Sequence, residues 1–425
     1  MLWGLGEWLY PKDGRAYQAI VPYIEADTSA DTCVYGTSTM FYGFVPYYSD
    51  HLTGTKCALM ATAAQSPQQS WYVFSAYLAE GKTPKTVILN LAYNTLFSHT
   101  YTGRVSAIVE NLPVTNPVKY QMIADTGFEL EEMPELFLKA LVSREYLSTR
   151  LKELFTGKDD SISAEGLDEE LRQYLGGGYN YTESVNYRCG ATPYMSAEDF
   201  DETSLMYFEK IINTCRERGI EVILISMPHS PGAVLLTNAE RGGTYQEQHD
   251  AYVALAEKYG LPYWDLNYSR QEVLEITPEN FTAAAHANAT LAFRETALLA
   301  ELVQKYQAGT LVESEYFYDT YEEYVALHQG VNGLVVSTAI QTAKETGEHY
   351  LKMQTISTSG APEWRAFYKA KKSADWEPLT DWNAEGRISL PQEILTGSKI
   401  YIRIEMRSGS SGEAEMVYEK NYSVK

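Results

Sequence analysis

The chain has 425 residues, and its 34 Lys and Arg against 56 Asp and Glu give a net charge of −22. This acidity excludes proteins that bind nucleic acid or anionic lipid through basic patches, because both attractions require clustered Lys and Arg. Hydrophobic residues make up 45% of the chain and charged residues 21%, which is enough apolar material for packed cores in roughly two or three domains. We therefore expect a folded acidic enzyme or a protein that binds an uncharged ligand.

The four cysteines, Cys33, Cys57, Cys189 and Cys215, are too widely spaced for a metal-binding or redox motif. Cys33 and Cys57 lie in apolar runs, which favours buried thiols, although a disulfide is also open. We expect no metal and no cofactor. No apolar run approaches the ~18 residues of a membrane-spanning helix, so the sequence predicts no transmembrane segment in this chain.

The first residues do not have the pattern of an export signal, because no basic segment opens them and Glu7 interrupts the apolar stretch. The protein is therefore either cytoplasmic or exported with a segment outside this sequence. The 34 tyrosines are a surplus that suits sugar-facing surfaces, although packing is the commoner reason for a tyrosine.

Residues 1–310 alternate apolar, strand-like runs with amphipathic helical segments, which is typical of a parallel sheet flanked by helices. The predicted strands are Thr32–Tyr35, Cys57–Ala61, Thr86–Leu91, Glu221–Ser226 and Pro262–Asp265. The predicted helices are one that begins at Ser66-Pro67, then Asp201–Arg218, Gln246–Tyr259 and Ala289–Tyr306. Residues 98–200 interrupt the alternation and are predicted to form an insertion or lid over one end of the sheet.

After an acidic connector at residues 311–330, the hydrophobic pattern changes to a period of two, as in Ile402, Ile404 and Met406. The predicted strands here are Leu334–Ser337, Tyr350–Ile356, Trp364–Lys369, Tyr401–Arg407 and Met416–Tyr422. Short strands without a helical pattern indicate that residues 331–425 form a small Ig-like β-sandwich.

Residues suited to ester chemistry follow the predicted strands. Ser38 comes after the first strand, in Gly36-Thr37-Ser38, and Asn94 follows the third; His286 precedes the last helix. Because α/β folds place their sites at the carboxyl edge of the sheet, we expect Ser38 to lie there, beside a helix N-terminus whose N–H groups attract an oxyanion. Met40 replaces the second glycine of Gly-x-Ser-x-Gly, which disfavours the α/β-hydrolase elbow.

This order of serine, asparagine and histidine resembles the SGNH hydrolase superfamily (GDSL-type esterases and acyltransferases), most closely its Gram-positive surface members, over about residues 25–308. The resemblance implies a three-layer, flavodoxin-like α/β fold. It also implies that Ser38 is the nucleophile, His286 the general base and Asn94 an oxyanion donor. Ala64 matches the second-block glycine of the family, whose N–H also holds the oxyanion.

The chain departs from the family pattern at three alanines. Ala64 and Ala92 replace glycines, and Ala283 stands three residues before His286, where the family has the triad aspartate. That carboxylate orients the histidine, and losing it costs about 10⁴ in turnover. Asp265 and Glu279 are the nearest candidates in sequence for a substitute acid. A slow Ser–His dyad and a site that is no longer catalytic are the alternatives.

His229, after the fourth strand, and Asn288, just beyond His286, are further candidates for contacts with substrate. Our first hypothesis is a serine esterase that removes small acyl groups, above all O-acetyl groups on carbohydrate. The second is a degenerate accessory protein that binds glycan or passes acyl groups for a membrane acyltransferase in surface-polysaccharide acetylation. Both hypotheses favour an extracellular or cell-surface location, and a cytoplasmic one stays open.

Overall fold

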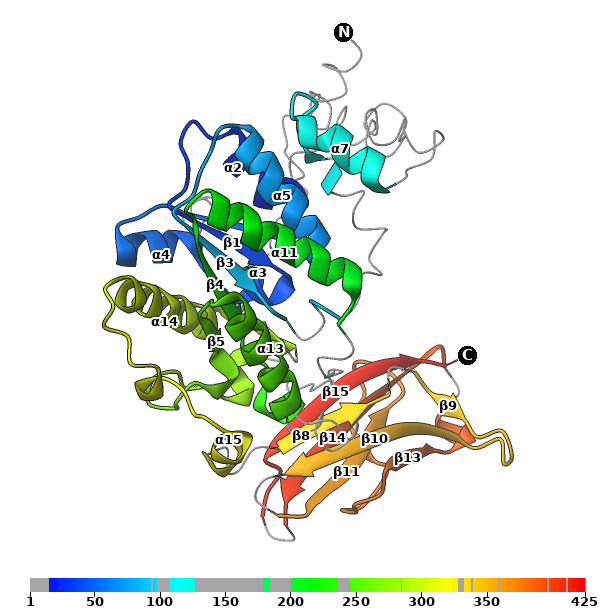
Figure 1. Ribbon diagram of the computed structural model, residues 1–425. Coiled ribbons are helices and arrows are strands. Elements are labelled where there is room, and N and C mark those ends of the chain that lie inside the picture. Colours follow the sequence, from blue (N-terminus) through cyan, green and yellow to red (C-terminus); the bar gives the residue numbers. More distant parts are fainter. Residues whose placement is uncertain are drawn as a thin grey trace.

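A computed structural model describes residues 15–92, 95–97, 108–109, 111–126, 179–183, 200–234, 245–283, 285–327, 332–337, 339–357, 360–395, 397–409 and 412–424. These residues form an α/β body followed by an all-β body (Figure 1). Of the predicted insertion at 98–200, only 108–109, 111–126, 179–183 and 200 belong to the described residues. Among the helices of the described ranges, none is both long and apolar enough to cross a membrane.

The α/β body is built on a parallel five-stranded sheet with the order β2-β1-β3-β4-β5. Its strands are β1 (Thr32–Gly36), β2 (Cys57–Ala61), β3 (Thr86–Asn90), β4 (Glu221–Ser226) and β5 (Tyr263–Asp265). Each strand coincides with a predicted run to within about one residue at either end. This order is the flavodoxin-like one, in which the chain reverses its direction of progress between β1 and β3.

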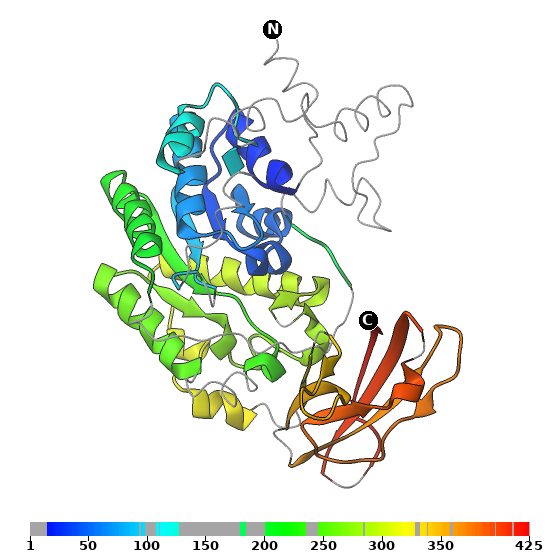
Figure 2. The same ribbon diagram turned by 90° about the vertical axis from the view of Figure 1, so that its right-hand side faces the viewer.

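Helices cover both faces of this sheet (Figures 1 and 2). One face carries α2 (Arg15–Glu25), α5 (Pro67–Ala79), α11 (Glu202–Glu217) and α13 (Tyr245–Tyr259), with α7 (Pro117–Thr126) packed on α5. The other face carries α3 (Ser38–Gly43), α4 (Pro46–Thr53) and α14 (Ala289–Gln307). The predicted three-layer α/β architecture is therefore confirmed.

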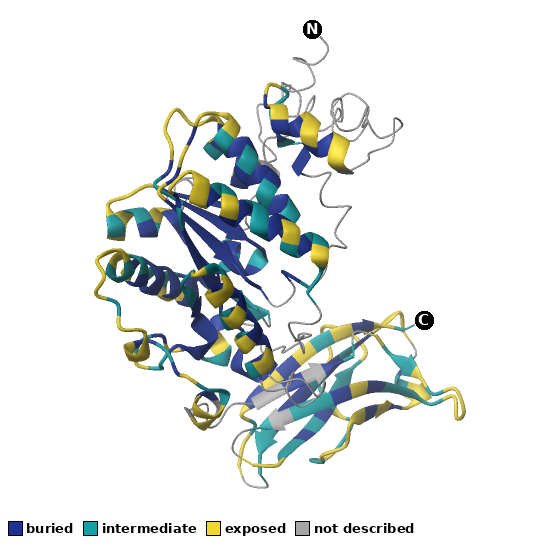
Figure 3. Cartoon of the chain, in the orientation of Figure 1, coloured by how far each residue is buried: buried dark blue, intermediate teal, exposed yellow. Residues whose placement is uncertain are grey.

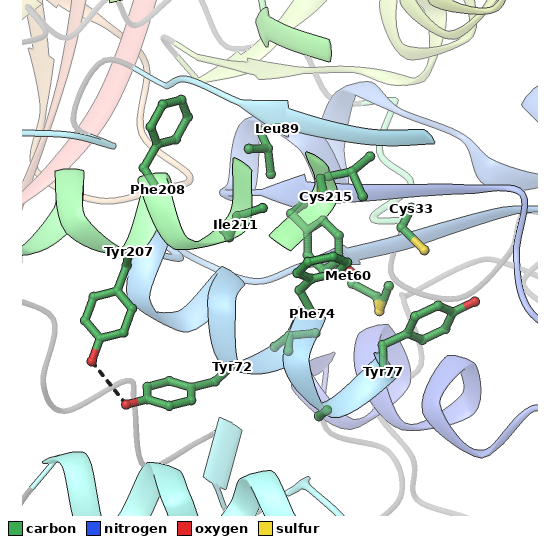
Figure 4. Close-up of a cluster of buried hydrophobic side chains, with 14 of the residues drawn as sticks. Cys33, Met60, Tyr72, Phe74, Tyr77, Leu89, Tyr207, Phe208, Ile211 and Cys215 are labelled. Atoms are coloured by element: carbon green, nitrogen blue, oxygen red, sulfur yellow. Dashed lines mark hydrogen bonds between the residues drawn. The ribbon is translucent and has the colours of Figure 1, made fainter. Parts of the chain in front are cut away.

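The strands divide their side chains between two cores, because successive residues of a strand point to opposite faces. In β1, Cys33 and Tyr35 pack in the core under α5 and α11, whereas Val34 packs in the core under α3 and α14. Figure 3 shows the strands as the most buried part of the body. Figure 4 shows the first core, where Tyr72 of α5 and Tyr207 of α11 share a hydrogen bond of 3.2 Å.

The thiols of Cys33, Cys57 and Cys215 are free and buried, as expected for the first two. Burial raises the pKa of Cys33 and of Cys215 to about 12, because an apolar surrounding disfavours the thiolate. These three cysteines therefore serve packing and are not nucleophiles.

Helix starts in the α/β body follow local sequence signals. Ser66 caps α5 in a capping box: its Oγ accepts from the Gln69 N–H at 3.3 Å, and Gln69 Oε1 accepts from the Ser66 N–H at 2.8 Å. Asp201 and Asn288 cap α11 and α14 through their side-chain oxygens. The cap at Asn288 fixes where the chain turns from His286 into α14.

The C-terminal body is a sandwich of two antiparallel sheets. One contains β8 (Asn332–Val336), β9 (Gln341–Thr342), β10 (His349–Ser357) and β13 (Arg387–Leu390); the other contains β11 (Pro362–Lys369), β12 (Glu377–Pro378), β14 (Lys399–Ser408) and β15 (Met416–Ser423). Ile402, Ile404 and Met406 of β14 are fully buried in the core between the sheets. The β-sandwich that the alternating sequence predicts is therefore confirmed.

The acidic connector contains α15 (Tyr321–Leu327) after a short turn at Glu313–Glu315. Its carboxylates are exposed, whereas Tyr318 and Tyr324 are buried against Tyr245 and Tyr268 of the α/β body. Part of the tyrosine surplus is therefore explained by packing at this connection.

Candidate functional site

Ser38 lies where β1 ends, at the reversal point of the sheet. It is the first residue of α3, directly after the cap residue Thr37, and the first N–H groups of a helix have no partner within that helix. Gly36 makes this tight connection feasible, because a Cβ there would lie 2.6 Å from Asn90 Cβ and 2.7 Å from Met40 Cγ. The connection therefore brings the Ser38 side chain to the carboxyl edge of the sheet, where α/β proteins of this kind bind ligands.

The structure brings Ser38 and His286 together across 248 positions of sequence. The two atoms Ser38 Oγ and His286 Nε2 are 2.9 Å apart, and the serine hydroxyl donates when Nε2 is unprotonated. The His286 ring also stacks on Tyr42 of α3, with centroids 4.3 Å apart and an interplanar angle of 16°. The imidazole is thus held by the same helix that carries the serine.

His286 lies in a short antiparallel ribbon formed by β6 (Phe281–Ala283) and β7 (His286–Ala287). Ala283 is the cross-strand partner of His286 in this ribbon. Paired residues of antiparallel strands have Cβ atoms about 5 Å apart, so a carboxylate at position 283 would be within reach of the imidazole. The ribbon keeps the geometry suited to an aspartate, and the side chain at that position is a methyl group.

Ala64 follows β2, whose last residue Ala61 pairs with Gly36 of β1. Its φ is +50°, and among the residues the structure describes it is the one non-glycine residue with a positive φ. Left-handed backbone is typical of glycine, which is the residue that the resemblance places here. The alanine therefore keeps the backbone turn of a glycine, together with its N–H, beside the end of β1.

The two sequence candidates for a substitute acid, Asp265 and Glu279, lie in different surroundings. Within the described chain, the hydrogen bonds of the Asp265 carboxylate go to Tyr245, His249 and Asn267, with His249 Nδ1 at 2.9 Å from Oδ2. Glu279 is exposed, and its backbone carbonyl accepts from Asn288 Nδ2 at 2.8 Å.

His229 and Asn288, the candidates for substrate contacts, are both buried. The side-chain oxygen of Asn288 caps α14, and its Nδ2 donates to the Glu279 carbonyl. Both polar groups of this side chain therefore have structural roles. His229 follows β4, and its backbone N–H donates to Asn267 Oδ1 at 2.8 Å. Burial lowers the pKa of His229 to about 4, so this imidazole is neutral at ordinary pH.

Asn94, the predicted oxyanion donor, lies outside the described residues. The structure instead shows a role for Asn90, the last residue of β3, which sequence reasoning missed. Its Oδ1 accepts from Thr39 Oγ1 at 2.8 Å, which ties β3 to the first turn of α3. The only signal for this role in the sequence was that Asn90 is a polar residue at the end of an apolar strand. In the structure it faces Gly36 of the neighbouring strand β1.

Glu295 of α14 is a second buried polar group near α3. Its carboxyl is almost fully buried, and a Cβ at Gly43 would collide with Glu295 Oε2, so the glycine leaves room for it. Burial raises the pKa of Glu295 well above its usual value, because an apolar surrounding disfavours the charged carboxylate. The described residues contain no group of His, Cys, Asp and Glu arranged to hold a metal ion.

No family model matches the sequence, and no curated protein matches it. Among solved structures, a protein described as lipolytic and of the G-D-S-L family from Desulfitobacterium hafniense aligns at 10% identity and a TM-score of 0.31, over 64% of this chain and 98% of its own. A protein described as an acylhydrolase from Bacteroides fragilis aligns at 10% identity and a TM-score of 0.31, over 69% of this chain and 95% of its own. A GDSL-like lipase from Bacteroides thetaiotaomicron aligns at 10% identity and a TM-score of 0.28, over 66% and 89%. Overall similarity this low does not bear on activity, which must be argued from the site itself.

Proposed function

We propose that this chain is a serine ester hydrolase of the SGNH type that acts on small acyl esters. The observation that carries the proposal is the 2.9 Å contact between Ser38 Oγ and His286 Nε2 at the reversal point of the sheet. A hydroxyl becomes a useful nucleophile at neutral pH when an adjacent base can take its proton. The stacked ring of Tyr42 fixes that base in place.

The reaction follows from this geometry. Ser38 Oγ attacks the acyl carbon while its proton moves to His286 Nε2. The protonated His286 then gives the proton to the leaving alkoxide oxygen as the ester C–O bond breaks. A water molecule attacks the acyl-serine in the same way, with His286 first accepting and then returning a proton, which frees the acid and restores Ser38.

The negative charge on the tetrahedral intermediate requires hydrogen-bond donors. We assign this role to the N–H groups of Ser38 and Ala64, which lie at the ends of the adjacent strands β1 and β2, and to the side chain of Asn94. Removing a single oxyanion donor from an enzyme costs about 10²–10³ in turnover, so each of the three should matter separately.

For the substrate, we propose O-acetyl esters on carbohydrate at the cell surface. The support is the family resemblance, the net charge of −22, which disfavours anionic esters, and the surplus of tyrosine. A cell-surface location and a membrane acyltransferase as partner belong to the same proposal. The β-sandwich would then hold or present the enzyme near its polymer.

The test is hydrolysis of p-nitrophenyl acetate and of acetylated sugars by the wild type and by Ser38→Ala. We expect the variant to lose at least about 10³-fold in rate, because the nucleophile is absent. The stability of the variant, followed by circular dichroism, serves as the control. Equal rates for the two proteins would refute the assignment of Ser38.

Ala283 beside His286 favours a second candidate, an accessory protein that binds glycan or passes acyl groups on without efficient hydrolysis. A fluorophosphonate probe separates the two. It reacts with an activated serine, so labelling that disappears in Ser38→Ala supports the esterase. A folded wild type that takes up no label supports the accessory role.

A further inference from the structure

A cavity of about 350 Å³ lies between the edge strand β5, helix α13 and the acidic connector. Neither Ser38 nor His286 lines it, so it is separate from the ester site. Its volume is in the range of about 300–1,000 Å³ that is usual for the pockets of small ligands. The cavity is therefore large enough to hold a ligand of its own.

The two walls of this cavity are joined by backbone pairing. The N–H of Tyr318 in the connector donates to the carbonyl of Tyr268, which follows β5, at 2.8 Å. The neighbouring residue Phe317 forms an antiparallel β-bridge with Ser269. Because the connector is bonded to the body in this way, the cavity belongs to the folded structure and is already formed without a ligand.

His249 of α13 lines the cavity and is oriented by Asp265. Its Nδ1 lies 2.9 Å from Asp265 Oδ2. Asp265 is itself buried, and its Oδ1 accepts from the N–H and the Nδ2 of Asn267 at 3.0 and 2.8 Å. The ring of Tyr268 meets the imidazole edge-on, with centroids 4.4 Å apart. A carboxylate at Nδ1 selects the neutral tautomer that carries its proton there, so Nε2 is an acceptor.

The protein leaves this acceptor unused. Within the part of the chain that the structure describes, the hydrogen bond of the His249 ring is the one from Nδ1 to Asp265. Nε2 is not among the side-chain atoms that are buried without a partner, and the side chain keeps 16% of its exposure. The imidazole is thus fixed on one side and open to solvent on the other, on the wall of the cavity.

The remaining polar lining consists of further acceptors. Glu257 of α13 and Asp319 of the connector are exposed, and neither carboxylate has a partner among the described residues. No described Lys or Arg lines the cavity. Arg270 is engaged elsewhere: its Nε donates to the Ser314 carbonyl at 2.9 Å, and its guanidinium lies 4.7 Å from the centre of the Tyr318 ring. The lining therefore favours a ligand that donates hydrogen bonds and disfavours an anion.

We propose that this cavity is a second binding site, which takes an uncharged ligand rich in hydroxyl groups and of the size of one sugar ring. Hydroxyl groups of the ligand donate to His249 Nε2 and to the carboxylates of Glu257 and Asp319. The rings of Tyr263 and Phe317 supply apolar wall for the C–H groups of the ligand. An apolar ligand would leave the three acceptors without donors, which costs binding energy.

This inference does not depend on ester hydrolysis at Ser38. It gives the α/β body a contact with carbohydrate that is separate from the reacting groups. Such a contact would hold a polymer at a second point beside the edge strand β5.

The first experiment maps the site by chemical modification of the full chain. Diethyl pyrocarbonate reacts with accessible imidazole nitrogens, and mass spectrometry gives the rate at each histidine. The probes are glucose, galactose, mannose and N-acetylglucosamine at high concentration. We expect His249 to react in the free protein and to be protected by at least about fivefold by one or more of these sugars. His51, an exposed histidine of α4, is the internal control and should not be protected.

Three outcomes of the modification experiment overturn the inference. They are no protection of His249 by any of the four sugars, equal protection of His51, and protection of His286 without His249. The last outcome would place the sugar at the ester site alone.

The second experiment measures the affinity of the protecting sugar by calorimetry. His249→Phe, Glu257→Ala and Asp319→Ala should each weaken binding by about 3- to 30-fold, because each removes one acceptor from the cavity. Glu257 and Asp319 are exposed, so their variants fold even where His249→Phe does not. Glu217→Ala is the matched control, an exposed carboxylate at the end of α11 outside the cavity, and should stay within about twofold.

Ethanolamine, which has an ammonium group and a single hydroxyl, tests the class of ligand. We expect it to bind more weakly than the sugar, because it fills less of the cavity and offers fewer hydroxyl donors. Binding of ethanolamine as tight as that of the sugar would indicate a cation site and overturn the inference. An equal loss of sugar affinity in Glu217→Ala and Glu257→Ala would indicate an effect of net charge and overturn it as well.

Discussion

Among the residues assigned to the site, Ala64 has an unusual backbone conformation. Its φ of +50° places a side chain in a region where the Cβ crowds the backbone. Such a conformation costs about 1–2 kcal/mol for a residue other than glycine. The alanine persists there because the surrounding loop determines the backbone, with Gln65 buried and bonded to the Met60 carbonyl at 3.1 Å.

Ala64→Gly should therefore raise the free energy of unfolding by up to about 1 kcal/mol, since glycine adopts this φ without strain. The backbone N–H stays in place, so labelling of Ser38 should be at least as fast as in the wild type. Ala63→Gly is the control, an exposed neighbour without a positive φ, and it should leave the protein slightly less stable. Chemical denaturation gives both values, and a loss of stability in Ala64→Gly would contradict the strain argument.

At the scale of elements, the position of Ser38 depends on how α3 is attached to the sheet. The helix has six residues and makes no side-chain cap at Thr37, so its position is set by tertiary contacts rather than by its own stability. One of these contacts is the hydrogen bond from Thr39 Oγ1 to Asn90 Oδ1. The other end of the helix packs against α14, where Gly43 leaves space for Glu295.

Asn90→Ala should lower the free energy of unfolding by about 1–3 kcal/mol, because the buried hydroxyl of Thr39 loses its hydrogen bond to Asn90 Oδ1. It should also slow labelling of Ser38, since the first turn of α3 is no longer tied to β3. Asn116→Ala is a matched control: this asparagine is equally buried and bonds the Ala76 carbonyl at 2.9 Å, in the helices of the opposite face. A similar stability loss without slower labelling is expected for the control. Unchanged labelling in Asn90→Ala would show that the hydrogen bond between Thr39 and Asn90 does not position Ser38.

For the whole molecule, the charged and buried groups determine how stability changes with pH. His229 has a folded pKa of about 4 against 6.5 for the free side chain, lowered first by burial and also by His286, while Asn267 and Asp265 raise it. Between these two values the unfolded chain binds a proton that the native protein does not. Stability must therefore fall as the pH falls from 6.5 towards 4.

The size of this effect is about 3 kcal/mol for the single histidine. We expect urea denaturation between pH 7 and pH 4 to show a steeper loss of stability in the wild type than in His229→Gln. The comparison of slopes removes the contributions of the carboxylates common to both proteins, including Glu295, whose raised pKa acts in the opposite direction. Parallel slopes in the two proteins would show that His229 is not buried in its neutral form.

The amino-acid sequence by itself was enough to predict the layered architecture of this protein. Alternation in the strands, the capping signals at Ser66, Asp201 and Asn288, and the period of two in β14 are local consequences of side-chain geometry, and the structure has elements where they predict them. The parallel direction of the strands follows from their alternation with helices. Ser38 and His286 could be paired from the sequence because their order with Asn94 resembles that of the SGNH family.

Only the tertiary structure decided which residues act together around that pair. Asp265 looked like a substitute acid from its position at the end of a strand, yet its carboxylate faces His249, Tyr245 and Asn267. The positions of Asn90 under α3 and of Asn267 beside His229 depend on contacts between strands far apart in sequence. Periodicity fixes which face a side chain occupies, but hydrogen-bond partners across a sheet edge depend on the packing of several elements at once.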